Sequence, residues 1–160
     1  MANTLPFIWR KPSCSNPQKL CDKIESVCKS WENTPYSRII TEKGKGASCS
    51  GFVFSVLDDL HKIQDKLINV NTLKNTELTK MALKRYIPCN RVSDTFMEPG
   101  DIIVFKKNDD YSAHLFLVGG KRNHIWHADY PGVVLTGISI NKGISPHAIF
   151  RSANKESWLP

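Results

Sequence analysis

The spacing of the apolar residues changes once along the chain, near residue 98, and this change limits the fold more than any other feature. Before it, apolar side chains recur every three or four residues, which is typical of helices. After it, short apolar runs alternate with turns rich in glycine and proline, which is typical of strands joined by hairpins. This order predicts the α+β class, with N-terminal helices packed on an antiparallel sheet of about five strands.

Three helices are predicted in the first part of the chain. The first is capped by Ser15 or Asn16 and ends before Asn33, and its apolar residues form one continuous face. The second runs from about residue 49 to 60, again with one apolar face. A third is expected at about 71–85.

The second part predicts five strands joined by short turns. Apolar runs of the length of strands occur at about residues 102–105, 113–118, 124–128, 133–136 and 147–151. Residues 87–95 are expected to form a loop and 1–15 an irregular arm. The tail, 152–160, carries Trp158, which is expected to dock on the body. We interpret 1–160 as one domain.

The composition excludes some classes of function. No apolar run approaches the ~20 residues that a membrane-spanning helix needs. The apolar block at 5–9 is shorter than the ~7–15-residue core of a signal peptide, so we expect synthesis in the cytoplasm without a signal peptide. The formal net charge of +7 suits an acidic partner. Because the basic residues are scattered and no aromatic residues interleave with them, nucleic acid is not an expected partner.

The stretch Gly46-Ala47-Ser48-Cys49-Ser50-Gly51-Phe52-Val53 places a cysteine in the first turn of the second helix. Free N–H groups and a positive partial charge at a helix N-terminus lower the pKa of a thiol, and the thiolate is the nucleophilic form. The position of Cys49 therefore favours a nucleophile. The alternative is a small buried apolar residue, which is the usual role of a free cysteine.

The other cysteines do not form a recognisable metal motif. Cys14, Cys21 and Cys28 recur every seven residues, and no pair has the spacing of a zinc knuckle. We interpret Cys21 and Cys28 as core residues. No metal site is expected from the sequence.

A nucleophilic thiol needs a base, and the base needs a group that orients it. His114 lies early in a predicted strand, on the side of Phe116 and Val118, and we expect this side to face the helices. His127 lies in the next strand, and a hairpin through Gly119-Gly120 would bring it beside His114. One imidazole would then hold the tautomer of the other.

Three other histidines are weaker candidates. His61 lies about 18 Å from Cys49 along the second helix, which is too far for a base. His124 is expected to point to the other face of its strand and to be exposed. His147, in the last strand, is an alternative orienting residue.

Five short motifs occur in the order and spacing of a known family. They are Asn33-Thr34-Pro35-Tyr36, Ser48-Cys49-Ser50-Gly51-Phe52-Val53, Glu98-Pro99-Gly100-Asp101-Ile102-Ile103-Val104-Phe105, His114-Leu115-Phe116-Leu117-Val118-Gly119-Gly120 and Ile125-Trp126-His127-Ala128. Together they resemble the NlpC family of cell-wall cysteine peptidases, over about residues 34–151. Each motif alone is weak, but five in order are fairly specific.

The resemblance implies a papain-like core with a Cys-His-His site. Cys49 would be the nucleophile, His114 the general base and His127 the orienting residue, with the Cys49 N–H in the oxyanion hole. Substrate contacts would come from Tyr36, Ser48 and Ser50. The family hydrolyses amide bonds in peptidoglycan stem peptides, commonly between γ-D-glutamate and a diamino acid. It uses a thioester intermediate and no metal or organic cofactor.

The chain departs from the family pattern in two places. Many members have Asp directly before the cysteine, where it holds the free amine of the stem peptide, but Ser48 stands here. The family's Trp-Gly-Gly after Pro-Tyr is replaced by Ser37-Arg38-Ile39. A small basic domain of this kind is similar to effectors injected into rival bacteria and to phage lysis or tail enzymes. Such proteins reach the cell wall or periplasm by a specialised route, and a toxin among them would have an immunity or inhibitor protein as a partner.

Two alternatives stay open at this point. The amidases called CHAP domains share the order cysteine then histidine, but they usually have Asn or Glu in the third position, where His127 stands here. A catalytically inactive papain-like scaffold that serves as a binding module is the other alternative.

Overall fold

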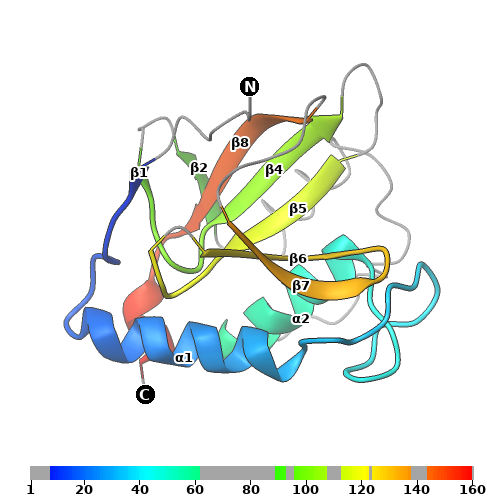
Figure 1. Ribbon diagram of the computed structural model, residues 1–160. Coiled ribbons are helices and arrows are strands. Elements are labelled where there is room, and N and C mark those ends of the chain that lie inside the picture. Colours follow the sequence, from blue (N-terminus) through cyan, green and yellow to red (C-terminus); the bar gives the residue numbers. More distant parts are fainter. Residues whose placement is uncertain are drawn as a thin grey trace.

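Among the described residues, two of the three predicted helices precede the sheet (Figure 1). The computed structural model describes residues 8–61, 89–92, 96–107, 113–122, 124–137 and 144–159. The helices are α1 (Pro17–Ser30) and α2 (Cys49–His61), and a 3-10 helix, η2 (Lys155–Trp158), follows the last strand. The helix expected at 71–85 lies outside the described residues. The chain belongs to the α+β class.

Within the part of the chain that the structure describes, six strands form one antiparallel sheet. Across it lie, in order, β2 (Cys89–Val92), β8 (Ile144–Ser152), β4 (Ile102–Lys107), β5 (Ala113–Val118), β6 (His124–Asp129) and β7 (Gly132–Gly137). The five predicted strands are all among them. The prediction of a loop at 87–95 is wrong for β2, which forms because it pairs with β8, a partner far along the chain.

The N-terminal arm also carries a strand. β1 (Ile8–Trp9) pairs in parallel with β3 (Phe96–Met97) in a separate two-stranded sheet. The backbone N–H of Arg10 continues this pairing with a 2.9 Å hydrogen bond to the carbonyl of Met97. The prediction of an irregular arm is therefore wrong at residues 8–9. A two-residue strand is too short to show the alternation of apolar and polar residues by which strands are recognised in a sequence.

Helix α1 begins and packs as predicted. The side chain of Asn16 accepts a hydrogen bond from the backbone N–H of Lys19 at 3.1 Å, which caps the helix. Cys21 and Cys28 are 4% and 0% exposed. Their predicted role as core residues is confirmed.

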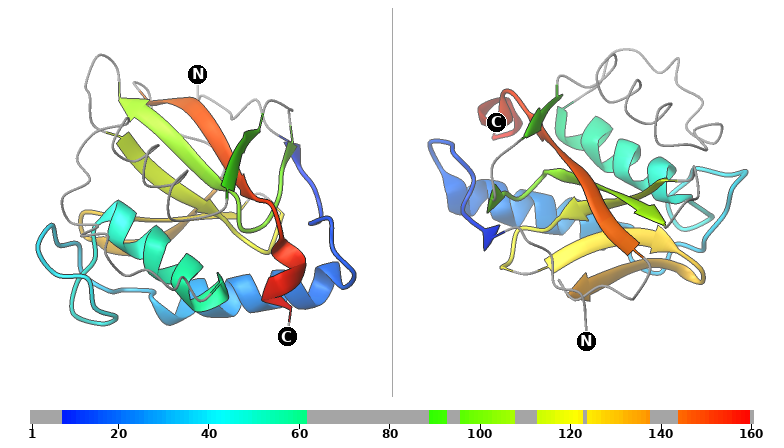
Figure 2. Two further views of the ribbon diagram at one scale, coloured as in Figure 1. Left: turned by 180° about the vertical axis from the view of Figure 1, so that it is seen from behind. Right: turned by 90° about the horizontal axis from the view of Figure 1, so that it is seen from above.

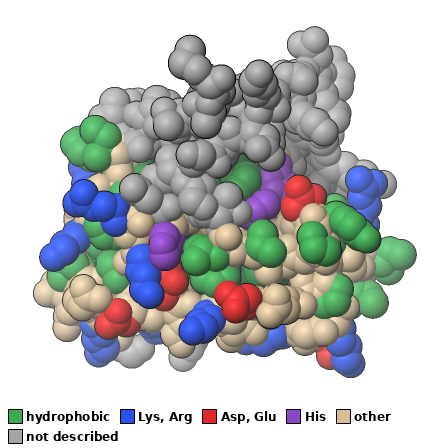
Figure 3. Space-filling model, in the orientation of Figure 1, with side chains coloured by type: hydrophobic (Ala, Val, Ile, Leu, Met, Phe, Trp, Pro, Cys, Tyr) green, Lys and Arg blue, Asp and Glu red, His purple; other side chains and the backbone are tan. Residues whose placement is uncertain are grey.

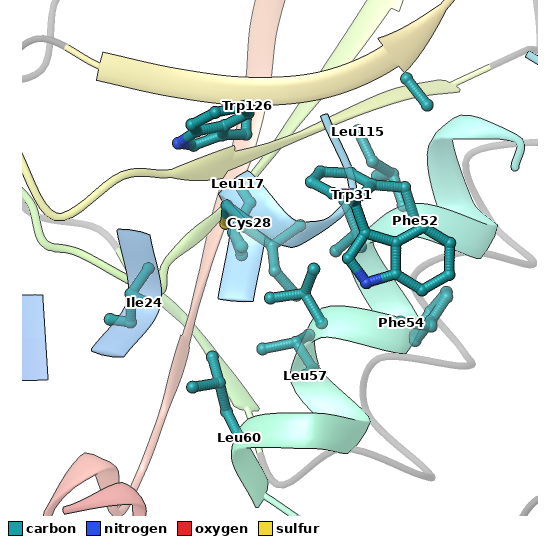
Figure 4. Packing of buried hydrophobic residues seen from close by; sticks show 14 of the residues in the cluster. Ile24, Cys28, Trp31, Phe52, Phe54, Leu57, Leu60, Leu115, Leu117 and Trp126 are labelled. Carbon is teal, nitrogen blue, oxygen red and sulfur yellow. The ribbon is translucent and has the colours of Figure 1, made fainter. Parts of the chain in front are cut away.

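Helix α2 packs against α1, β5 and β6. Figure 4 shows side chains from these four elements meeting in one core, among them Ile24, Phe52, Leu57 and Leu117. Phe54 lies off the predicted apolar face of α2 but is only 5% exposed. The helix is therefore buried on more than the one face that its sequence indicates.

Both helices lie on the same face of the sheet (Figure 2). Leu115 and Leu117 of β5 point into the core that the helices form, whereas Phe116 and Val118 belong to a second apolar cluster on the opposite face. His114 shares the side of Phe116, so the expectation that it faces the helices is wrong. Strand alternation fixes which residues share a face. Because both sets are apolar, it does not tell which face the helices cover.

The β5–β6 turn is held tightly against α1. A Cβ added at Gly120 would lie 2.0 Å from the carbonyl oxygen of Cys21, so only glycine permits this approach. Glu25 Oε1 accepts hydrogen bonds from the backbone N–H of Gly120 at 2.9 Å and from Trp126 Nε1 at 3.2 Å. These contacts fix the hairpin that carries both candidate imidazoles.

Five charged side chains gather where β4 begins and β8 ends. This ionic cluster consists of Arg10, Glu98, Asp101, Arg151 and Lys155. Asp101 is fully buried, and its carboxylate lies 2.7 Å from Lys155 Nζ and 2.9 Å from Arg151 Nη2. The tail that supplies Lys155 also buries Trp158 completely, which confirms that the tail docks on the body.

Candidate active site

Cys49 is the first residue of α2, as predicted, and Ser48 caps this helix. The backbone N–H of Gly51 donates to Ser48 Oγ at 3.0 Å, and that of Phe52 donates to the Ser48 carbonyl at 2.9 Å. Ser48 and Ser50 are both buried, and their hydroxyl oxygens lie 3.4 Å apart. Ser48 therefore has a structural role at the start of the helix. The substrate contacts that the resemblance implies for these two serines stay a prediction.

The thiol of Cys49 lies against β5. Burial raises the pKa of the Cys49 thiol, and this effect outweighs the hydrogen bonds from backbone N–H groups at Leu115, Ser50 and Cys49 itself, which lower the pKa. The carboxylate of Asp129 raises it further. The predicted lowering of this pKa is therefore wrong, because desolvation is larger than the effect of the helix N-terminus. At neutral pH Cys49 is a thiol, and a nearby base has to take its proton for it to act as a nucleophile.

His114 and His127 meet across the β5–β6 hairpin. His114 Nε2 and His127 Nδ1 lie 2.9 Å apart, which is a hydrogen-bond distance. The ring of His127 stacks on Phe116 with 4.4 Å between centroids, and His114 meets the same ring edge-on at 4.8 Å. Leu117 pairs with Trp126 in this hairpin, so the two histidines are diagonal neighbours. The predicted proximity of the two imidazoles is confirmed.

Both imidazoles are neutral at pH 7. Burial and the positive charge of His127 lower the pKa of His114 to about 4, and Asp129 acts in the opposite sense. Burial also lowers the pKa of His127, again opposed by Asp129. A neutral imidazole can accept a proton, which is what the base for a thiol must do.

Asp129 is a member of this site that the sequence reasoning missed. One ligand atom from each of His114, His127 and Asp129 lies within 4.8 Å of the other two, and we call these three residues the imidazole cluster. Asp129 is exposed, and its Oδ1 accepts a hydrogen bond from the backbone N–H of Tyr130 at 2.8 Å. The signal was available, since residues two apart in a strand share a face.

Tyr36 lies between the start of α2 and the β6–β7 turn. It forms a parallel bridge with Ala47, and its backbone N–H donates to the carbonyl of Pro131 at 3.1 Å. A Cβ added at Gly132 would lie 2.4 Å from the Thr34 carbonyl oxygen, so a glycine is needed for this close approach. The backbone of Tyr36 thus contacts the segment just before the helix that carries the thiol, and also the turn that follows His127 and Asp129.

Arg38 is a second residue whose place near the site was not predicted. A hydrogen bond to the side chain of Tyr36 raises the pKa of Arg38, and the charges of Tyr36 and Cys49 act in the same direction. The guanidinium is fully exposed. Among the described residues no carboxylate forms an ion pair with it. A positive charge therefore lies within electrostatic reach of Cys49, where the family pattern has Trp-Gly-Gly.

The remaining histidines lie apart from this arrangement. His61 ends α2 and His147 lies in β8, but their side chains are outside the described part of the chain. His124 is half-buried, with its Nδ1 covered, so the expectation of an exposed ring is wrong. The reason is that His124 shares its side of β6 with Trp126 and Ala128, which belong to the core that the helices cover.

Figure 3 shows histidine and acidic side chains next to one another on one face of the molecule, with apolar side chains beside them.

No family model matches the chain, and a search of the curated proteins finds no match. No helix among the described residues has both the length and the apolar character needed to cross a membrane.

Proposed function

We propose that the protein is a cysteine hydrolase of the NlpC type, with a papain-like core, that cuts an amide bond in peptidoglycan stem peptides. The observation that carries the proposal is the hydrogen bond between His114 and His127, next to a backbone N–H at Leu115 that bonds the thiol of Cys49. Leu115 directly follows His114 in β5, which supports a site that includes both the thiol and the imidazole pair. The carboxylate of Asp129 acts on all three groups, which supports the same grouping.

The hydrogen bond between the histidines assigns a role to each ring nitrogen. His114 Nε2 is engaged with His127 Nδ1, so Nδ1 of His114 is the nitrogen that takes the thiol proton. Before the reaction His114 then carries its proton on Nε2 and donates it to His127. When His114 becomes an imidazolium, this hydrogen bond and the negative charge of Asp129 stabilise it. His127 is thus a positioning residue.

The chemical steps follow from these positions. His114 removes the proton as the sulfur of Cys49 attacks the amide carbonyl, and backbone N–H groups at the start of α2 stabilise the oxyanion. His114 then protonates the leaving amine. Water hydrolyses the thioester, which regenerates the thiol and releases the carboxylic acid.

The charge of Arg38 favours one of the amide bonds in a stem peptide. A glutamate that is linked through its γ-carboxyl keeps a free α-carboxylate near the scissile bond, and a guanidinium binds carboxylates well. Ser48 stands where many members have Asp, so the residue before Cys49 carries no charge, and the exposed guanidinium of Arg38 is a cation that interacts electrostatically with Cys49. We therefore propose the γ-D-glutamyl to diamino acid bond. Delivery to the cell wall or periplasm by a specialised route, and an immunity or inhibitor protein as a partner, belong to the same proposal.

Digestion of purified peptidoglycan tests the function. The parent protein is expected to release fragments whose masses, measured by mass spectrometry, identify a cut in the stem peptide. Cys49→Ala is expected to release none. Cys14→Ala, which removes another partly buried thiol, is the matched control and is expected to cleave like the parent. Binding without cleavage by the folded parent would point to the inactive module, and a cut next to the sugar would point to a CHAP-like amidase.

The identity of the substrate is tested separately with two muropeptides. One carries D-glutamate and the other D-isoglutamine, in which the α-carboxylate is an uncharged amide. Arg38→Gln is expected to raise KM about three- to tenfold on the first muropeptide and to leave the second nearly unchanged, because an exposed ion pair contributes modestly. Equal effects on both would contradict a contact between Arg38 and the carboxylate.

A further inference from the structure

The imidazole cluster combines two imidazole rings and one carboxylate at short range. The two histidines are diagonal neighbours in the β5–β6 hairpin, and one ligand atom from each of the three residues lies within 4.8 Å of the other two. Zinc prefers imidazole nitrogen and carboxylate oxygen, and its sites with three protein ligands leave a fourth position for water. The chemistry of the donor set therefore fits zinc better than magnesium or calcium, which prefer oxygen ligands.

The side chains of the imidazole cluster would have to move only slightly to bind a zinc ion. With zinc–nitrogen bonds of about 2.0–2.1 Å, tetrahedral ligands lie about 3.4 Å apart. His114 Nε2 and His127 Nδ1 are now 2.9 Å apart, so they would separate by about half an ångström. Asp129 is exposed, and its Oδ1 accepts a hydrogen bond from the backbone N–H of Tyr130, so a carboxylate that binds the ion through Oδ2 would keep this bond.

The hairpin that carries these ligands is held on both sides. Phe116 stacks on His127 and meets His114 edge-on, and the backbone N–H of Gly120 in the β5–β6 turn donates to Glu25 of α1. Ligands held by rigid elements lose little conformational entropy when an ion binds. This preorganisation distinguishes the cluster from a set of exposed acidic side chains.

We propose that His114, His127 and Asp129 form a zinc site, and that zinc bound there blocks the hydrolase. The second half of the proposal rests on the proposed function. Zinc needs the lone pair of His114 Nε2, so the proton of that ring moves to Nδ1, the atom that has to accept the thiol proton. Both ring nitrogens of His114 are then occupied. The protein can hold zinc or act as a thiol hydrolase, but not both at once.

Calorimetric titration of the metal-free full chain with zinc chloride tests the site without any substrate. One binding event is expected, and it is expected to weaken at least about tenfold in Asp129→Asn. Asp22→Asn removes an exposed carboxylate on α1 and is the matched control, with unchanged affinity expected. Equal affinities for the parent and Asp129→Asn, or no binding at all, would overturn the zinc site.

Thiolates also bind zinc, so the same titration is run on Cys49→Ala. Binding that persists in this variant supports the imidazole cluster, and binding that disappears assigns the ion to the thiol and overturns the proposal. Cobalt is a second probe, because its visible absorption differs between tetrahedral nitrogen–oxygen and thiolate coordination. Asp129 is exposed, and circular dichroism checks that Asp129→Asn is folded.

The peptidoglycan digestion is then repeated with increasing zinc and with a chelator. Inhibition of the parent that follows zinc occupancy, is reversed by the chelator and is weaker in Asp129→Asn supports the second half of the proposal. Full activity of the zinc-saturated protein would overturn it. Zinc binding in a protein that cleaves no peptidoglycan would leave the site standing and remove only the proposed function, so the two failures are distinguishable.

Discussion

The ionic cluster and the imidazole cluster lie at opposite ends of the β4–β5 pair. Asp101 directly precedes Ile102, which pairs with Leu117, whereas His114 pairs with Phe105 near the far end of β4. The two clusters are built on the same strands and share the same core. What differs is how far their polar groups are paired.

At the ionic end, the three inner side chains are buried and paired. The side chains of Glu98, Asp101 and Lys155 are 3%, 0% and 4% exposed, and each has an oppositely charged partner within 4.0 Å. At the imidazole end, His114 and His127 are half-buried and neutral. A paired, buried charge contributes to the fold, whereas a neutral and partly open base can exchange protons. Burial together with full pairing therefore distinguishes the polar residues that hold this fold together from those that are suited to chemistry.

The largest expected effect is on activity, at the imidazole end. His127→Ala is expected to lower kcat about 100- to 10,000-fold, because His114 loses the partner that holds its tautomer. His127→Asn, which keeps an acceptor near the position of Nδ1, is expected to recover part of the loss. The free energy of unfolding is expected to change by less than about 1.5 kcal/mol in both variants. Steady-state kinetics and urea unfolding measure these quantities, and an equal loss of kcat in the two variants would contradict the positioning role.

At the ionic end, substitutions are expected to lower the free energy of unfolding. Asp101→Ala leaves Arg151 and Lys155 without their shared carboxylate, which is expected to cost about 3–5 kcal/mol of unfolding free energy. Urea unfolding measures the loss. Asp22→Ala, at an exposed carboxylate of α1, is the control and is expected to change stability by no more than about 0.5 kcal/mol. A loss of unfolding free energy below about 1 kcal/mol for Asp101→Ala would contradict the structural role of the ionic cluster.

The pH dependence of stability provides a smaller effect. Desolvation acts to raise the pKa of Glu98, but Lys155, Arg151 and the hydrogen bond from Arg10 outweigh it, so the pKa lies below its ordinary value of 4.5. A carboxyl with a lowered pKa adds stability that is fully present above its unfolded pKa and is lost as the pH falls through its folded pKa. Unfolding free energy is therefore expected to fall below pH 4.5 in the parent and to fall less in Glu98→Gln. Parallel pH profiles for the two proteins would show that Glu98 does not contribute in this way.

The smallest effect is expected at the rim of the ionic cluster. The side chain of Arg10 is 37% exposed, although it bonds Glu98 at 2.7 Å. Arg10→Gln is expected to lower stability by about 1 kcal/mol or less, because solvent screens a partly exposed pair. Lys45→Gln removes the more exposed pair with Glu42 and is expected to have almost no effect. Thermal unfolding measures both, and an Arg10→Gln loss as large as that of Asp101→Ala would show that burial does not decide the ranking.

Much of the fold was predictable because helices and strands each impose a characteristic spacing on the apolar residues of a short segment. The start of α1 at an Asn16 cap, the start of α2 at Cys49 and the whole of β5 are all where the sequence predicts them. β1 and β2 were not predictable, because each is short and forms only against a partner far along the chain. The meeting of His114 with His127 was predictable from the length of the hairpin between them.

The sequence alone determined the types of the main elements and which side chains share a face, because both depend on residues within a few positions of one another. Only the tertiary structure decided which face of the sheet the helices cover and how deeply each group is buried. Burial set the pKa of Cys49 above its ordinary value, against the prediction. It also decided that the charges of Glu98, Asp101 and Lys155 pair with one another rather than face water. Solvation depends on all the elements packed around a group, and no local pattern contains that information.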